Sequence, residues 1–349
     1  MGTRNKVAAR RRQACTNESY ETLRRLFDRG APRRMPGALG AQALLESRVM
    51  ELVASGNSWW AHPTGIAGVR ITPSELLVRL DGHTVLGGGT PYPMAEYALD
   101  YLLPIAGAGV ELNGVAGLRA QPLSETDLLL SLVGTCARVV LNGQEGTDWP
   151  ALLAERRSRL VEDGPSRSLG LHPLWGEARL TYHERDPAYM SVRSMELDRA
   201  SLGSALLRRI GWFEHYSAAY STKCWVKGRE WVLELESSYD AALPHNVLLD
   251  ALADPVWGLG LTVKRQHCNC AVGRQPYPWE TSCLFYLGND EHRAPLQVRF
   301  RSAEVDGRPD YRAILTSVGA EKRWLNRVLP DQTRTKRGDR QGEVAWGNQ

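Results

Sequence analysis

The sequence is poor in cysteine and contains no long apolar run, and both absences limit the class of protein. Six cysteines among 349 residues are unevenly spaced, so they do not form a disulfide framework, and reduced thiols in a cytoplasm are the plainer interpretation. The best candidate membrane span, 97–110, is interrupted by Asp100 and Pro104 and is shorter than the roughly 20 apolar residues of a spanning helix. The basic N-terminus has no apolar stretch behind it, as a secretory signal would. We therefore expect a cytoplasmic protein without a membrane partner.

The common signatures of catalysis are also missing. There is no Gly-x-x-x-x-Gly-Lys-Ser/Thr phosphate loop, no Gly-x-Ser-x-Gly nucleophile turn, no zinc-protease helix and no dinucleotide fingerprint. These absences leave open whether the protein is an enzyme, but they favour a binding protein. Lysine is scarce too, with 6 Lys against 37 Arg. GC-rich coding explains this bias, and so does a need for the planar arginine fork that suits phosphates.

Positive charge is concentrated at the N-terminus. Residues 1–34 contain ten basic and three acidic side chains, a net charge of +7, whereas the other 315 residues sum to −3. A basic segment on a slightly acidic body is typical of a nucleic-acid contact, because neutralised phosphates release counterions. We therefore predict phosphate contacts from the ten basic residues Arg4, Lys6, Arg10, Arg11, Arg12, Arg24, Arg25, Arg29, Arg33 and Arg34. A solvated or protein-docking extension is the alternative.

The same basic segment has the pattern of two short helices. A first helix ends at a break at Thr16-Asn17, and a second begins with acidic side chains in its first turn, where the helix dipole favours them. Apolar residues of the second helix recur at helical spacing, and Gly30 ends it. The pattern predicts a basic helical hairpin over 1–36, together with its linker.

One segment of the sequence occurs twice, as an internal repeat. Gly65-Ile66-Ala67-Gly68-Val69-Arg70 recurs 49 residues later as Gly114-Val115-Ala116-Gly117-Leu118-Arg119, and similar strand-like runs follow each copy. A fixed period indicates a repeated supersecondary unit. Each copy reads as three strands and a helix, and we interpret its glycines as devices for tight strand entry.

These patterns together predict an α+β protein with four regions. The helical hairpin occupies 1–36, a tandem β-β-β-α repeat 37–164, an α+β domain with a mainly antiparallel sheet 165–330, and a disordered tail 331–349. In the third region we expect strands at 177–182, 223–226, 230–236, 261–266, 282–287, 296–301 and 311–316, with helices at 202–210, 245–253 and 320–328.

Thiols and imidazoles gather in the third region. Zinc takes thiolate sulfur and imidazole nitrogen in tetrahedral geometry. The candidate ligands of a zinc site are Cys268, Cys270, Cys283 and either His267 or His292, with His292 preferred. The spacing does not match the common Cys-x-x-Cys knuckle. Cys-x-Cys equally places two thiols on one face of a strand, and buried cysteines without a cofactor are the alternative.

Three further groups have both a chemical and a structural interpretation. His183-Glu184-Arg185-Asp186 concentrates titratable groups where a general base could lie, but a solvated turn has the same composition. Trp225 and Trp231 flank a predicted hairpin turn and could stack on bases if exposed, or belong to the core if buried. We interpret His215 as a hydrogen-bonded core residue.

Three functions remain open on the sequence. We expect a nucleic-acid-associated, DNA-binding protein held through its Arg-rich hairpin. A structural protein that assembles with itself or with a protein partner is the first alternative, and a metal-dependent enzyme acting on nucleic acid is the second.

Overall fold

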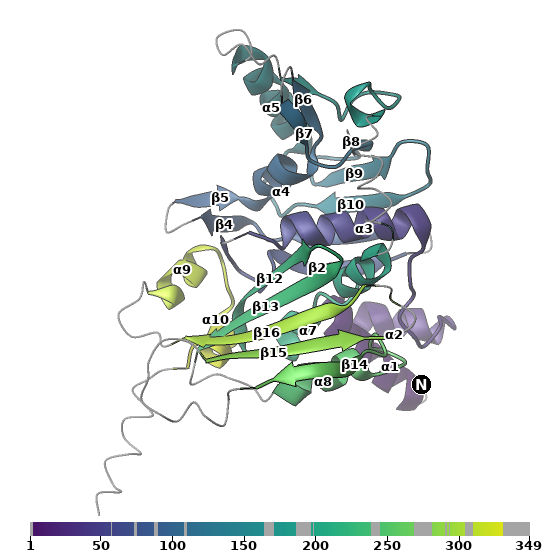
Figure 1. Ribbon diagram of the computed structural model, residues 1–349, viewed down its shortest axis with the longest axis vertical. Helices are drawn as coiled ribbons and strands as arrows, with labels where there is room; N and C mark the ends of the chain where they lie inside the picture. Colours follow the sequence, from purple (N-terminus) through teal and green to yellow (C-terminus); the bar gives the residue numbers. More distant parts are fainter. Residues whose placement is uncertain are drawn as a thin grey trace, which may run out of the picture.

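The computed structural model describes residues 3–330 apart from 57, 73–74, 87–89, 108–109, 164–170, 186–196, 198, 239–244, 269–280, 290–291, 293 and 304–309. Helices and mainly antiparallel strands are mixed along these residues, and the predicted α+β class is confirmed (Figure 1). The predicted disordered tail, 331–349, lies outside the described residues. Within the part of the chain described, none of the helices has the length and apolar character needed to cross a membrane.

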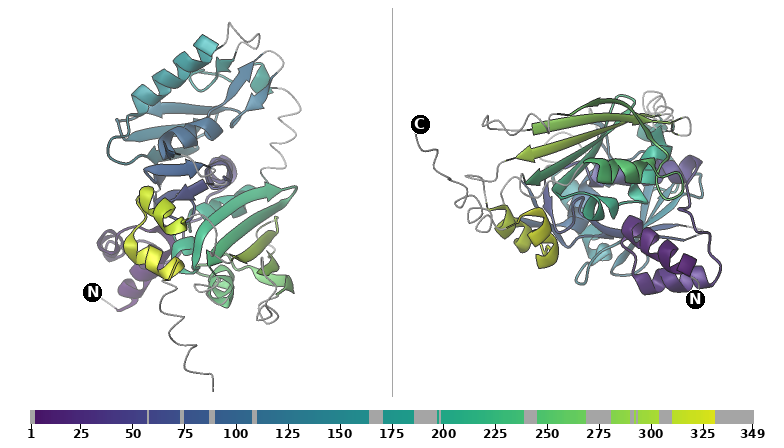
Figure 2. Two further views of the ribbon diagram at one scale, coloured as in Figure 1. Left: turned by 90° about the vertical axis from the view of Figure 1, so that its left-hand side faces the viewer. Right: turned by 90° about the horizontal axis from the view of Figure 1, so that it is seen from below.

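The chain begins with the predicted helical hairpin. Helices α1 (Thr3–Thr16) and α2 (Tyr20–Asp28) lie side by side (Figure 2, right). The break between them is at Asn17, which has a left-handed backbone, φ 55°, a conformation that asparagine tolerates better than most residues. Ser19 caps α2, because its hydroxyl accepts a hydrogen bond from the Thr22 amide at 3.2 Å.

Hairpins from both copies of the sequence repeat lie in one sheet. Its order is β2-β3-β10-β9-β8, with bounds Ile66–Ile71, Leu76–Leu80, Arg138–Asn142, Asp127–Leu132 and Leu118–Pro122. Strand β10 is antiparallel to β9 and parallel to β3. The third strand of the first copy, β4 (His83–Leu86), instead pairs with β1 (Ser58–Trp60) and β5 (Pro91–Pro93) in a separate sheet. The tandem β-β-β-α repeat therefore stays a prediction.

Equivalent glycines of the two copies share one backbone conformation. Gly65, before β2, has φ +73°, and Gly114, before β8, has φ +78°. A side chain at Gly114 would place its Cβ 2.3 Å from the carbonyl oxygen of Leu103, so both the conformation and the close approach require glycine there.

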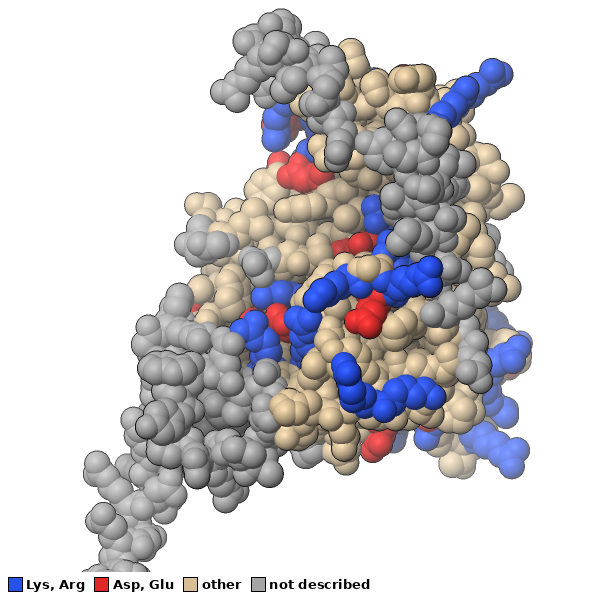
Figure 3. Space-filling view, in the orientation of Figure 1, with Lys and Arg blue, Asp and Glu red and all other residues tan. Residues whose placement is uncertain are grey.

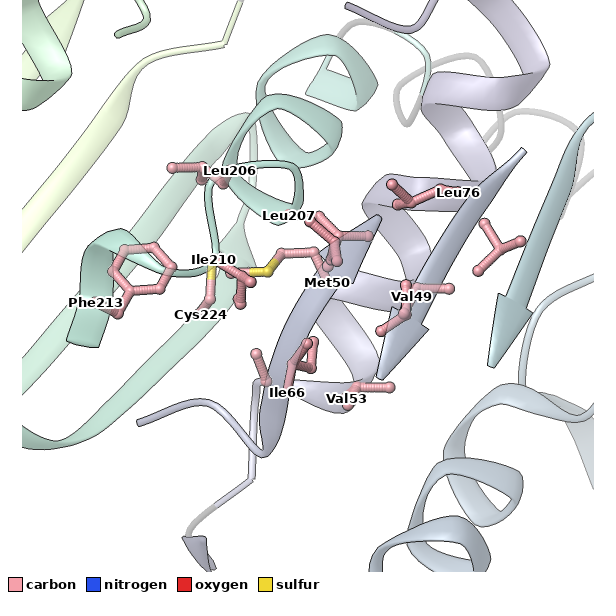
Figure 4. Close-up of a cluster of buried hydrophobic side chains, with 14 of the residues drawn as sticks. Val49, Met50, Val53, Ile66, Leu76, Leu206, Leu207, Ile210, Phe213 and Cys224 are labelled. Carbon is pink, nitrogen blue, oxygen red and sulfur yellow. The ribbon is translucent and has the colours of Figure 1, made fainter. Parts of the chain in front are cut away.

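Helices and a small sheet complete the first half of the chain. Helix α3 (Gly40–Val53) lies between the five-stranded sheet and the C-terminal sheet and packs against strands of both (Figure 1). The apolar side chains of Val49, Met50 and Val53 fill the space between Ile66, Leu76 and the C-terminal elements (Figure 4). The other elements are α4 (Met94–Leu102), α5 (Trp149–Asp163) and the sheet β11-β6-β7, with bounds His172–Pro173, Ile105–Gly107 and Val110–Asn113.

The C-terminal sheet is mainly antiparallel, as predicted. Its order is β12-β13-β16-β15-β14, and only β13 and β16 run parallel; the bounds are Ala219–Lys227, Glu230–Ser238, Leu296–Ala303, Thr281–Gly288 and Thr262–His267. A helix over 199–207, α7 (Trp212–His215) and α8 (His245–Ala253) accompany it.

Two expected strands are wrong. Residues 177–182 form turns and bends that lead into the short 3-10 helix η1 (His183–Arg185). The predicted strand at 311–316 is helix α9 (Tyr311–Ser317), capped by Asp310, whose carboxylate accepts from the Ala313 amide at 3.0 Å. Because helical spacing places Tyr311 and Leu315 on one face, both are buried against α10 (Lys322–Val328) in a small second core.

The main core is one continuous cluster of buried side chains. It runs from Ala8 and Leu23 in the hairpin, through α3 and the five-stranded sheet, to Val298 in β16. The hairpin is therefore packed into the body rather than attached beside it. The predicted domain boundaries at residues 36 and 164 stay predictions.

A buried ion pair joins α3 to the C-terminal half. The Glu46 carboxylate is fully buried and accepts hydrogen bonds from Arg208 Nε at 2.7 Å and Arg208 Nη2 at 2.6 Å. The Ser204 hydroxyl donates to the same carboxylate at 2.6 Å. These contacts satisfy both charges in the interior, which a buried ion pair requires.

Candidate functional site

The hairpin exposes most of the basic side chains predicted to contact phosphate. Eight of the ten are exposed: Arg4, Lys6, Arg10, Arg11, Arg25, Arg29, Arg33 and Arg34. Basic side chains project at the lower right of Figure 3, where the hairpin lies. Among the residues that the structure describes, Arg4, Lys6, Arg10, Arg29 and Arg34 have no side-chain hydrogen bond or ion pair. These five define what we call the open basic surface.

The other predicted phosphate ligands have partners within the protein. Arg12 is buried, 3.2 Å from the Glu18 carboxylate, and also donates to the Ile71 carbonyl at 3.3 Å. It therefore anchors the hairpin and is not available to phosphate. Arg11 pairs with Asp254 at 3.1 Å, and Arg24 and Arg25 share Glu21.

The positive charge at the start of α1 does not stabilise the helix. Arg4 and Lys6 lie in its first turn, which contains no acidic residue. The dipole of a helix disfavours cations at this end and favours anions. Arg33 is close by, since its Nε donates to the Asn5 side chain at 3.0 Å, and Asn5 in turn bonds the last turn of α2. An anion at this end of the hairpin would neutralise both the dipole and these cations.

The outer face of the C-terminal sheet is a second basic surface with aromatic residues. Arg299 lies over the half-buried Trp225 ring at 5.4 Å, and Arg265 lies over Tyr286 at 4.1 Å. Trp231, in contrast, is a core residue that donates to the Arg199 carbonyl. Glu234 pairs with Arg299 at 3.5 Å and with a second arginine of β16, so much of this positive charge is already neutralised.

A polar pocket of about 470 Å³ lies where the hairpin turn meets β1, β3, α7 and α10. His62 lines it, and its Nδ1 is 2.6 Å from the carboxylate of Asp81, which is fully buried behind the ring. Burial alone would lower the pKa of His62, but the hydrogen bond and charge of Asp81 outweigh it and raise this pKa above 6.5. The imidazole is held in one orientation, as in a general acid or base with an orienting carboxylate.

A second histidine, His215, lines the same pocket, and it is exposed rather than in the core as expected. Its Nε2 is 2.9 Å from the Asn17 side chain, which also donates to Glu214 at 3.0 Å. Partial desolvation of the ring lowers the pKa of His215; the charge of Glu214 opposes this effect and that of Arg327 adds to it. The two histidines therefore have pKa values displaced in opposite directions, as an acid–base pair requires.

The predicted metal ligands are divided in space. Cys268 and Cys283 are together, with their sulfur atoms 3.6 Å apart, whereas Cys270 lies outside the described residues. His292 follows the other end of β15, whose last residue, Gly288, is roughly 17 Å along the strand from Cys283; the Nδ1 atom of His292 is 3.2 Å from the Ser201 hydroxyl. The group of possible metal ligands among the described residues does not include His292, and its predicted role as a ligand stays a prediction. His245, from α8, is the imidazole next to the two thiols. His267 is opposite Leu284 on the outer face of the sheet.

Of the titratable group at 183–186, the structure describes residues 183–185, and Glu184 among them makes structural contacts. The Glu184 carboxylate pairs with Arg119 at 2.9 Å and accepts from the Gly117 amide at 2.7 Å. Burial acts to raise the pKa of Glu184, but the hydrogen bonds from Arg119 and from the amides of Thr181 and Gly117 outweigh it and lower this pKa. The lowered pKa makes this carboxylate a weaker base than a free glutamate.

Comparison with known proteins gives no relative: no family model, curated protein or solved structure matches this chain. The sites therefore rest on their own geometry. Sequence reasoning missed His62, Asp81 and His245, because their partners are distant in the chain and no local motif marks them.

Proposed function

We propose that this protein binds nucleic acid through phosphate contacts from its N-terminal hairpin. The observation that supports this proposal is the open basic surface: five exposed cations, three on α1 and two in the segment that follows α2, none with a partner among the described residues. Two of them, Arg4 and Lys6, oppose the dipole of α1, so helix stability does not explain them. The attachment of the hairpin to the core would transmit binding to the body as a rigid unit.

The first test is binding of labelled duplex and single-stranded DNA, measured by fluorescence anisotropy over a salt series. Five to eight phosphate contacts predict that log K falls against log salt with a slope of about −4 to −7. Binding without salt dependence, or no binding at low salt, would contradict the proposal. The second result would favour a protein partner for the hairpin.

A second candidate function, acid–base catalysis, is favoured by the polar pocket. His62 and His215 line one pocket with pKa values displaced in opposite directions, and Arg79 beside them supplies positive charge. An imidazole that holds its proton more tightly, beside one that releases its proton more readily, would suit proton transfer to and from a bound substrate.

Histidine titrations measured by NMR test the electrostatics of this pocket. We expect His62 to titrate above pH 6.5 and His215 below it. In Asp81→Asn the ring of His62 stays half-buried but loses its anion, so its pKa should fall below that of the wild type. Titration of both histidines at pH 6.5 in the wild type would remove the argument for an acid–base pair.

A further inference from the structure

We propose that His245, Cys268 and Cys283 hold a zinc ion. The three ligand atoms, one from each side chain, all lie within 4.8 Å of one another. They come from three places in the fold: the first residue of α8, the residue directly after β14, and the strand β15. This inference is independent of the DNA-binding proposal.

Two of the three distances between ligand atoms are close to those of a tetrahedral zinc centre. With Zn–S bonds of ~2.3 Å and a Zn–N bond of ~2.0 Å, tetrahedral angles separate two thiolates by about 3.8 Å and a thiolate from an imidazole by about 3.5 Å. Here the two sulfur atoms are 3.6 Å apart, and Cys268 Sγ is 3.9 Å from His245 Nδ1. A disulfide would require the sulfurs to be ~2.05 Å apart.

The chemistry of the ligands selects the metal. Two thiolates and an imidazole are soft and borderline ligands, which zinc accepts and which magnesium and calcium do not prefer. The group contains no carboxylate. Three of the four ligands of a tetrahedral site are therefore present among the described residues.

The fold orients each ligand toward the same point. Cys283 faces the core side of the sheet together with Phe285. The antiparallel register, His267 opposite Leu284, places Cys268 opposite Cys283 when extended by one residue. The His245 ring is stacked on Phe300 at 4.2 Å and is edge-on to Phe285 at 5.4 Å, which fixes the plane of the imidazole.

Zinc would also supply a contact that β14 otherwise lacks. Every side chain of β14, Thr262–His267, is exposed, so this edge strand has no buried side chain to hold it. A metal bonded to Cys268, Cys283 and His245 would join the end of the strand to β15 and to α8. The role we assign to the ion is therefore structural.

Metal analysis of the full chain, purified under reducing conditions, tests this site. We expect about one zinc per chain in the wild type and in Cys136→Ser, which removes an exposed cysteine elsewhere, and a loss of at least tenfold in zinc occupancy in Cys283→Ser and Cys268→Ser. Wild-type protein without zinc, or a Cys283→Ser variant with full occupancy, would overturn the proposal.

Two measurements on the wild type test the site even if the cysteine variants fail to fold. Cobalt added to reduced, metal-free protein should give visible bands of tetrahedral cobalt and thiolate-to-cobalt charge transfer, and their absence would overturn the site. Chelation should increase hydrogen exchange at β14, β15 and the start of α8 but not at β8–β10. Unchanged exchange at β14 and β15, or a Cys268–Cys283 disulfide in protein isolated with its native redox state trapped, would also overturn the proposal.

Discussion

Replacement of Glu46 by alanine is expected to lower the free energy of unfolding by about 3–5 kcal/mol. The Arg208 side chain is only 6% exposed, and the substitution would leave its guanidinium buried without the carboxylate that accepts two of its hydrogen bonds. The Ser204 hydroxyl would lose its acceptor as well. Because α3 contacts both large sheets, this loss affects the stability of the whole core and not only of one helix.

Urea denaturation followed by circular dichroism measures this effect. The matched control is Glu155→Ala, which removes an exposed carboxylate that pairs with Arg159 at 2.7 Å four residues along α5. An exposed helical pair contributes no more than about 0.5 kcal/mol, so the control should be close to the wild type. Equal stability of the two variants would show that the Glu46–Arg208 pair does not hold α3 in place.

A double variant separates the charge from the packing. Glu46→Leu combined with Arg208→Met removes both charges and keeps apolar volume, and such replacements of buried ion pairs are often neutral or stabilising. We expect the double variant to be more stable than Glu46→Ala.

Local patterns in the sequence predicted a helix or strand correctly where the spacing of its apolar residues matches the face that the element buries. The amphipathic helix α2 and the paired runs of β12 and β13 are examples. The strand predicted at 311–316 failed because Tyr311 and Leu315 make their contacts with α10, and helical spacing satisfies those contacts better. The strand predicted at 177–182 failed because Arg119 and Glu184 hold this segment as turns.

The sites were less predictable because they are assembled from distant parts of the chain. Charge alone marked ten hairpin residues, but it did not distinguish Arg12, which an internal carboxylate neutralises, from Arg4, which is open. Proximity in sequence favoured His292 as a metal ligand, whereas the sheet brings His245 to the two thiols. Neither distinction is visible without the packing of helices on the sheet.

Substitution of the open basic surface is expected to have the largest effect on nucleic-acid affinity. Removing residues 1–36 would also remove core side chains such as Leu23 and Phe27, so point substitutions are the sharper test. Five substitutions to glutamine, at Arg4, Lys6, Arg10, Arg29 and Arg34, should reduce the slope of log K against log salt by about 4–5. The affinity near 0.1 M salt should then fall by about two to four orders of magnitude, with no change in the thermal unfolding midpoint beyond a few degrees.

The matched control makes the same change in net charge elsewhere. Glutamine at the exposed basic residues Arg138, Arg157, Arg179, Arg185 and Arg229 lowers the charge by five and leaves the hairpin intact. If phosphates are bound by the hairpin, this control should keep most of the affinity and of the salt slope, because screening limits charges more than ~10 Å from the bound phosphates. Equal losses of affinity in the two variants would mean that binding depends on net charge alone. The hairpin would then not be the binding site.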